Sequence, residues 1–160
     1  MLTACTTPLN SLSPLQTEPV EYPQTVGCNF SDLTGYVHAE NNINAVQGLI
    51  VLSNYTDNPC LIDSIWDLLI VDSQQSPIIS TSINLVNTNI YAEQYLSIDF
   101  TWNNYCQQDS NEPFGVKILD TETQQMLYIP IEDPNGNLIS SPPACKDQNQ
   151  KQSFLLQISQ

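Results

Sequence analysis

Five cysteines are the residues of this 160-residue chain whose type and spacing carry the clearest chemistry. They are Cys5, Cys28, Cys60, Cys106 and Cys145. No two of them form a C-x-x-C pair, which is the spacing of zinc ribbons and thioredoxin-type sites. Four spread cysteines, with a fifth near the N-terminus, instead predict two disulfides and therefore an oxidising compartment. Four cysteines allow three pairings.

Acid–base and nucleophilic catalysis have few candidate residues. The chain contains one histidine, His38, and no G-x-S-x-G segment, whereas a hydrolytic triad needs a base beside its nucleophile. Asp120 with Glu122, or Glu132 with Asp133, could supply the two carboxylates of a glycosidase. Both pairs fall beside expected turns, where solvated acidic residues are ordinary. We therefore predict no catalytic residue and no cofactor.

The segment Asp133-Pro134-Asn135-Gly136-Asn137 has the composition of a calcium loop. An EF-hand requires glycine at the sixth position and a bidentate glutamate at the twelfth. Here Gly136 stands fourth and Ala144 stands twelfth, so we expect a hairpin turn. A transition metal would also lack nitrogen and sulfur ligands, and we predict no metal site.

The N-terminal residues Leu2-Thr3-Ala4-Cys5 resemble the lipobox of bacterial lipoproteins, an apolar residue and two small residues before a cysteine. The resemblance implies that Cys5 becomes the first residue and carries lipid on its sulfur, which attaches the protein to a membrane. Residues 1–5 are then the remnant of a lipoprotein signal. The charged and apolar stretches that precede a lipobox are missing, so we expect them upstream of Met1.

Residues 6–25 are rich in proline, serine and threonine and contain Pro8, Pro14, Pro19 and Pro23. Proline at this density favours an extended, partly stiff spacer rather than a packed core. We expect a tether that holds a folded domain, residues 26–160, away from the membrane. The chain has no apolar run of 18 residues, so no segment is expected to span a bilayer.

Charge limits the classes of partner. The chain has 17 acidic residues, three lysines and no arginine, and its formal net charge is −14. Phosphate backbones need Lys or Arg for even non-specific binding, so nucleic acid is not an expected partner. Acidity of this kind serves solubility or, in the alternative interpretation, a cationic ligand.

From Cys28 onward the apolar pattern has a period of two, which is typical of half-buried strands. Leu33, Gly35, Val37 and Ala39 alternate with polar residues, and so do Leu96, Ile98, Phe100 and Trp102. Further short apolar runs are 48–52, 65–71, 78–86, 116–119, 126–131 and 154–158. Residues 61–71 could be a buried helix, but β-branched residues and flanking turns favour a strand. Eight or nine short strands predict a sandwich or a barrel.

Several segments of residues 26–160 resemble a family of bacterial secreted and lipoprotein domains of unknown function. The matching segments are Cys28-Asn29-Phe30-Ser31-Asp32-Leu33, Gly48 to Asn54, Cys60-Leu61, Trp102-Asn103-Asn104-Tyr105-Cys106, Pro142-Pro143-Ala144-Cys145 and Ser153-Phe154-Leu155. The family usually has Gly-aromatic-Pro where this chain has Ser64-Ile65-Trp66.

The resemblance implies an immunoglobulin-like antiparallel β-sandwich of about eight strands without catalytic residues. The family pattern and proximity along the chain both favour disulfides Cys28–Cys60 and Cys106–Cys145. Exposed aromatic residues could form a carbohydrate platform, and the candidates are Tyr55, Tyr91, Tyr95, Trp102 and Tyr105. Trp66 and Trp102 lie within strand patterns and are expected in the core.

The sequence as a whole predicts a non-catalytic binding or structural domain in the bacterial cell envelope, in the periplasm or at the cell surface. Its expected partners are the membrane, through lipid on Cys5, and a protein or carbohydrate ligand. Two alternatives stay open. One is a secreted β-sandwich hydrolase that uses acidic residues, and the other is a calcium-dependent adhesion module.

Overall fold

A computed structural model describes residues 26–42, 44–107 and 112–159. Cys5, the lipobox and the tether of residues 6–25 lie outside this range. The described part contains eleven strands and one short 3₁₀ helix, and no α-helix. These elements are β1 (Val26–Gly27), η1 (Phe30–Asp32), β2 (Leu33–Asn42), β3 (Ala45–Asn54), β4 (Cys60–Ile62), β5 (Ile65–Val71), β6 (Pro77–Asn84), β7 (Thr88–Ile90), β8 (Tyr95–Asn103), β9 (Gly115–Asp120), β10 (Met126–Glu132) and β11 (Ser153–Ser159). The predicted all-β class is confirmed, and residues 61–71 are extended rather than helical.

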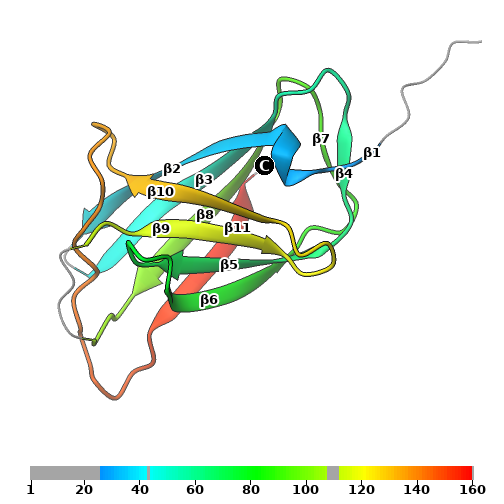
Figure 1. Ribbon diagram of the computed structural model, residues 1–160. Coiled ribbons are helices and arrows are strands. Elements are labelled where there is room, and N and C mark those ends of the chain that lie inside the picture. The colour runs from blue at the N-terminus through cyan, green and yellow to red at the C-terminus, as the bar shows by residue number, and fades with distance from the viewer. Residues whose placement is uncertain (1–25, 43, 108–111, 160) are drawn as a thin grey trace, which may run out of the picture.

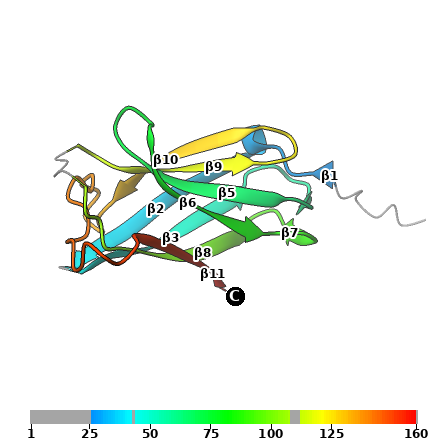
Figure 2. The ribbon, with the colours of Figure 1, turned by 90° about the horizontal axis from the view of Figure 1, so that it is seen from below.

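Eight of the strands form one continuous sheet in the order β11-β8-β3-β2-β10-β9-β5-β6. All neighbours in it are antiparallel except β10 and β2. The sheet curls until its two edge strands, β6 and β11, approach each other (Figures 1 and 2). The body of the molecule is therefore close to a barrel, and the approach of the edges limits their exposure to other chains.

The remaining strands, β1, β4 and β7, form a small separate sheet at one end of the molecule (Figure 1). β1 runs parallel to β4, with Val26 opposite Cys60, while β7 is antiparallel to β4. These three short strands account for the difference between the eleven strands observed and the eight or nine expected. Two- and three-residue strands leave too short a pattern to be seen in a sequence.

The core lies inside the curled sheet, and the alternation read from the sequence decides which side chains enter it. In β2, Leu33, Val37 and Ala39 are buried, while Tyr36 and His38 are exposed. Trp66 and Trp102 are both fully buried, as expected. Phe30 packs edge-on against Trp66 with ring centroids 4.9 Å apart, and Phe114 packs likewise on Trp102 at 5.1 Å.

Two disulfides hold the loops at the two ends of the sheet. They join Cys28 to Cys60 and Cys106 to Cys145, across sequence separations of 32 and 39 residues. These are the pairs that the family resemblance implies. Each closed loop removes unfolded-chain entropy worth about 4 kcal/mol. Two disulfides are typical of an oxidising environment outside the cytoplasm. Within the described residues, no helix has the length and apolar character needed to cross a membrane.

Candidate functional site

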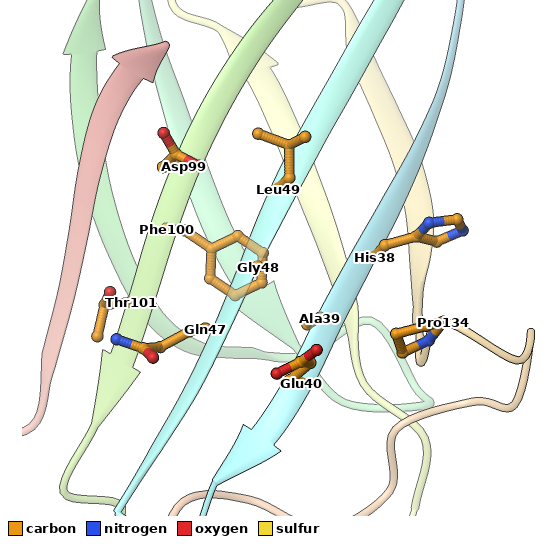
Figure 3. A pocket seen from close by; sticks show the side chains of 10 residues that line it. All are labelled: His38, Ala39, Glu40, Gln47, Gly48, Leu49, Asp99, Phe100, Thr101 and Pro134. Atoms are coloured by element: carbon orange, nitrogen blue, oxygen red, sulfur yellow. The ribbon is translucent and has the colours of Figure 1, made fainter.

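The outer face of the sheet is hollowed over β2, β3 and β8 (Figure 3). The hollow has a volume of about 450 Å³, which lies within the usual range of ligand sites. We call it the outer-face hollow. It is lined by His38, Ala39, Glu40, Gln47, Gly48, Leu49, Asp99, Phe100, Thr101 and Pro134.

Strand register arranges six of these residues in two rows across the three strands. In one row Leu49 of β3 stands opposite His38 of β2 and Asp99 of β8. In the second row, Gln47 stands between Glu40 and Thr101. Because side chains alternate along a strand, all six share one face of the sheet. The apolar side chain of Leu49 is thus flanked by His38 and Asp99 in its own row, and the second row adds a carboxylate, an amide and a hydroxyl.

Gly48 and Phe100 form part of the layer beneath this grid. A Cβ atom added at Gly48 would clash with the carbonyl oxygen of His38 and would lie 2.6 Å from Cβ of Ala39 and 2.7 Å from Cε1 of Phe100. Only glycine therefore allows the Phe100 ring to pack under β3. The buried ring, which is 2% exposed, supports the strand that carries Gln47 and Leu49.

The two carboxylates of the hollow belong to Glu40 and Asp99. Asp99 accepts a hydrogen bond from the hydroxyl of Ser159 on β11, which fixes its carboxylate at the rim. The ring of His38 packs against Tyr36, with centroids 4.7 Å apart. No lysine lines this hollow. Its groups can accept hydrogen bonds from hydroxyl or amine donors around the apolar side chain of Leu49.

The carboxylates singled out by sequence spacing lie outside this hollow, and Asp120 and Asp133 accept hydrogen bonds within their own turns. Asp120 is 7% exposed and accepts hydrogen bonds from Ser64 Oγ and from the N–H groups of Glu122 and Thr123. Burial acts to raise the pKa of Asp120, but the backbone N–H groups and the two hydroxyls outweigh it and lower the pKa. Such a group is ionised and committed to its own turn.

The calcium-like segment forms the hairpin turn that the sequence predicts. Oδ1 of Asp133 accepts the N–H groups of Asn135 and Asn137, both at 2.8 Å. Gly136 has a φ of +81°, which a residue with a side chain rarely adopts. The hydrogen bond from the Asn137 side chain, together with the backbone N–H groups of Asn137 and Asn135, lowers the pKa of Asp133 below its ordinary value. Within the described ranges, no three His, Cys, Asp or Glu residues are grouped so that they could hold a metal ion.

The candidates for an aromatic platform divide into two sets. Trp102 and Tyr105 are 0% and 7% exposed, so they belong to the core and cannot form the platform. Tyr55, Tyr91 and Tyr95 are exposed, and Tyr55 and Tyr95 line a second hollow of about 670 Å³. The alternation of apolar and polar residues in β8 correctly predicts that Trp102 lies in the core. Tyr105 follows the end of β8, where the alternation gives no information.

Sequence reasoning did not find the outer-face hollow, because its rows are made by strands far apart in the chain. The one feature of the sequence that could have pointed to this hollow is Gly48, a residue without a side chain within the apolar strand β3. A scan against protein-family models and a search of curated proteins each found no match to this chain.

Proposed function

We propose that this protein is a non-catalytic binding domain outside the bacterial cytoplasm, anchored by lipid on Cys5. Its ligand, a protein or a carbohydrate, contacts the outer face of β2, β3 and β8. The observation that carries this proposal is the outer-face hollow, where polar side chains lie beside the apolar side chain of Leu49. Apolar centres with a few convergent polar groups are the usual form of binding sites.

The position of the hollow suits a tethered domain. The chain enters the described structure at β1, and the turn that carries Pro134 lies at the opposite end of the sheet (Figure 1). A lipid on Cys5 and a spacer of residues 6–25 would hold β1 toward the membrane. The outer-face hollow would then be presented away from the membrane surface.

Other side chains lie between the two carboxylates of the outer-face hollow. Glu40 and Asp99 lie on the two strands that flank β3, so their backbones are roughly 10 Å apart across the sheet, with a further two-residue offset. Gln47 and Leu49 stand between them. A glycosidase needs the space between its two carboxyl groups for the scissile bond, so the intervening side chains support binding rather than hydrolysis.

We also propose that the fold is related to immunoglobulin-like sandwiches. The support is a sheet whose two halves, β11-β8-β3-β2 and β10-β9-β5-β6, face each other across one core. A parallel pair, β2 and β10, connects these halves.

Two experiments test the proposal. The gene with its upstream sequence is expressed in a bacterium, and mass spectrometry of the N-terminal peptide should find acyl groups on Cys5. The Cys5→Ser variant should leave the membrane fraction. Soluble, unmodified wild-type protein in the cytoplasm would contradict the anchor.

For the binding face, a photo-reactive phenylalanine replaces Leu49, or Met126 as the control, in living cells. Met126 is 61% exposed and lies outside the outer-face hollow. We expect one defined envelope component to crosslink at position 49 and not at 126. Equal crosslinking, or release of reducing sugar from glycans that Glu40→Gln abolishes, would contradict a non-catalytic binding face.

A further inference from the structure

A second hollow lies at the other end of β3 and β8, about 13 Å from Leu49 along the strand. We call it the tyrosine hollow. It is lined by Ser53, Asn54, Tyr55, Thr56, Asp57, Ala92, Glu93 and Tyr95. Its volume of about 670 Å³ is larger than that of the outer-face hollow. Six of the eight lining residues are uncharged, and none is a cation.

Two tyrosines dominate the surface of this hollow. Tyr55 is 62% exposed and Tyr95 is 68% exposed, although removal of a tyrosine ring from water is energetically favourable. Tyr55 is nevertheless held at two points. Its N–H donates to the carbonyl of Asp32 at 3.3 Å, and its hydroxyl donates to the carbonyl of Ser31. A ring already fixed in this way loses little conformational entropy when a ligand packs on it.

The loops that form the walls are tied together by Asn54, which is 3% exposed. Its Nδ2 donates to the carbonyls of Asn58 at 2.6 Å and Ile90 at 3.2 Å. Its Oδ1 accepts the N–H of Thr56 at 2.9 Å, and Asn54 also forms a parallel bridge with Ala92. The loop after β3 and the loop after β7 therefore have fixed relative positions. The hollow is a formed site rather than a gap between loose loops.

We propose that the tyrosine hollow binds an uncharged saccharide. A sugar ring has apolar C–H faces and a rim of hydroxyl groups, and the hollow offers both matching surfaces. The faces of Tyr55 and Tyr95 pack against the C–H faces, while Asp57 and Glu93 accept hydrogen bonds from the hydroxyls. The same carboxylates repel acidic sugars. This inference rests on the proposed function only in that the domain binds a ligand, since the site is a different one.

The test begins with the full 160-residue chain on an array of neutral, acidic and basic glycans, followed by calorimetry with the strongest neutral glycan. We expect Tyr55→Ala and Tyr95→Ala each to weaken binding about tenfold or more, because an aromatic contact is removed. Tyr95→Phe retains the ring and should stay within about threefold of wild type. Tyr91→Ala is the matched control, since Tyr91 is 50% exposed and lies outside the lining. A thermal melt of each variant excludes unfolding as the cause.

The variant Asp57→Asn distinguishes an uncharged saccharide from a cationic ligand. An amide oxygen still accepts a hydroxyl hydrogen bond, so saccharide affinity should change by less than about threefold, with little dependence on salt. A loss above tenfold, or preferential binding of basic glycans or of a hexalysine peptide, would overturn the proposal in favour of a cationic ligand. The absence of neutral glycan binding would also overturn it.

Neutral glycan binding that is lost on Leu49→Arg but retained by Tyr55→Ala and Tyr95→Ala would place the sugar in the outer-face hollow. That result would overturn this inference while supporting the proposed function. Conversely, equal crosslinking at positions 49 and 126 together with tyrosine-dependent glycan binding would overturn only the outer-face site.

Discussion

The side chain of Asn104 is joined to the backbone of Asp147, 43 residues later, by hydrogen bonds in both directions. Its Nδ2 donates to the carbonyl of Asp147 at 3.0 Å, and its Oδ1 accepts the N–H of the same residue at 3.2 Å. Nδ2 also donates to the carbonyl of Gln150, and Oδ1 accepts the N–H of Lys146. The C-terminal loop is therefore positioned by one buried amide at the end of β8.

Asn104→Ala should reduce the free energy of unfolding by about 2 kcal/mol, because four backbone groups lose a partner. Asn104 also has a φ of 56°, which asparagine tolerates better than alanine. Asn87→Ala is the control for that effect, since exposed Asn87 has a φ of 61°. Urea unfolding should show a clearly larger loss for Asn104→Ala. Equal losses would mean that backbone conformation, rather than the hydrogen bonds, explains the effect.

The carboxylate of Asp120 makes the free energy of unfolding depend on pH. Burial acts to raise its pKa, but the N–H groups of Glu122 and Thr123 and the hydroxyls of Thr123 and Ser64 lower it overall. The folded-state pKa therefore lies below the unfolded value of about 3.9. The stabilisation is present above that value and is lost as the pH falls through the folded-state pKa.

Asp120→Asn should accordingly be less stable than wild type at pH 7, and the difference should shrink as the pH falls below about 4. Denaturant unfolding at several pH values measures it. Asp133→Asn is the comparison, because Asp133 also has a lowered pKa but lies in an exposed turn. A pH-independent difference for Asp120→Asn would show that packing, not ionisation, is responsible.

The two disulfides close loops of similar length, 32 and 39 residues, but differ in solvent access. Cys106 and Cys145 are exposed, whereas Cys60 is 4% exposed and belongs to the core. Thiol–disulfide exchange requires access to sulfur, so mild reductant should open Cys106–Cys145 first under native conditions. Alkylation followed by peptide mapping gives the order. Earlier modification of Cys28 or Cys60 would show that the end near β4 opens more readily.

Gly48→Ala should destabilise the protein by about 2 kcal/mol through overpacking against the His38 carbonyl oxygen, Ala39 and Phe100. Phe100→Leu removes part of the ring that lies 2.7 Å from the added Cβ. The double variant should then lose less stability than the sum of the single variants. Thermal unfolding of all four proteins measures this coupling. Additive losses would locate the clash in the backbone of β2 instead.

The tether should contribute little to folding. Removal of residues 1–25 should leave the thermal midpoint within about 2 °C of the full chain, because surface tails usually contribute below about 0.5 kcal/mol. Removal of residues 1–28 deletes β1 and Cys28 and should cost about 4 kcal/mol. Unfolding after the shorter truncation would mean that residues before Val26 belong to the folded domain.

The amino-acid sequence was enough to predict the all-β class, the approximate positions of the long strands and the inward and outward faces of strands such as β2 and β8, although β3 extends to Ala45–Asn54 beyond the apolar run 48–52. It could do so because strand periodicity is local, and a residue's face depends only on its neighbours along the chain. The hairpin at Asp133 was also predicted, since turn chemistry resides in consecutive residues.

The neighbours of each strand, and therefore the side chains that meet across the sheet, became known from the three-dimensional structure alone. Glu40, Leu49 and Asp99 share a hollow because β3 lies between β2 and β8, and no local pattern contains that order. The short strands β1, β4 and β7 exist through their pairing rather than their propensity. Tyr55 and Tyr95 line the same hollow because buried Asn54 joins the loop that carries Tyr55 to the loop that precedes Tyr95. Its hydrogen bond to the carbonyl of Ile90 connects residues 36 positions apart. Pairing over such distances is set by the packing of the whole core, so the surfaces available for binding emerge only after the fold has formed.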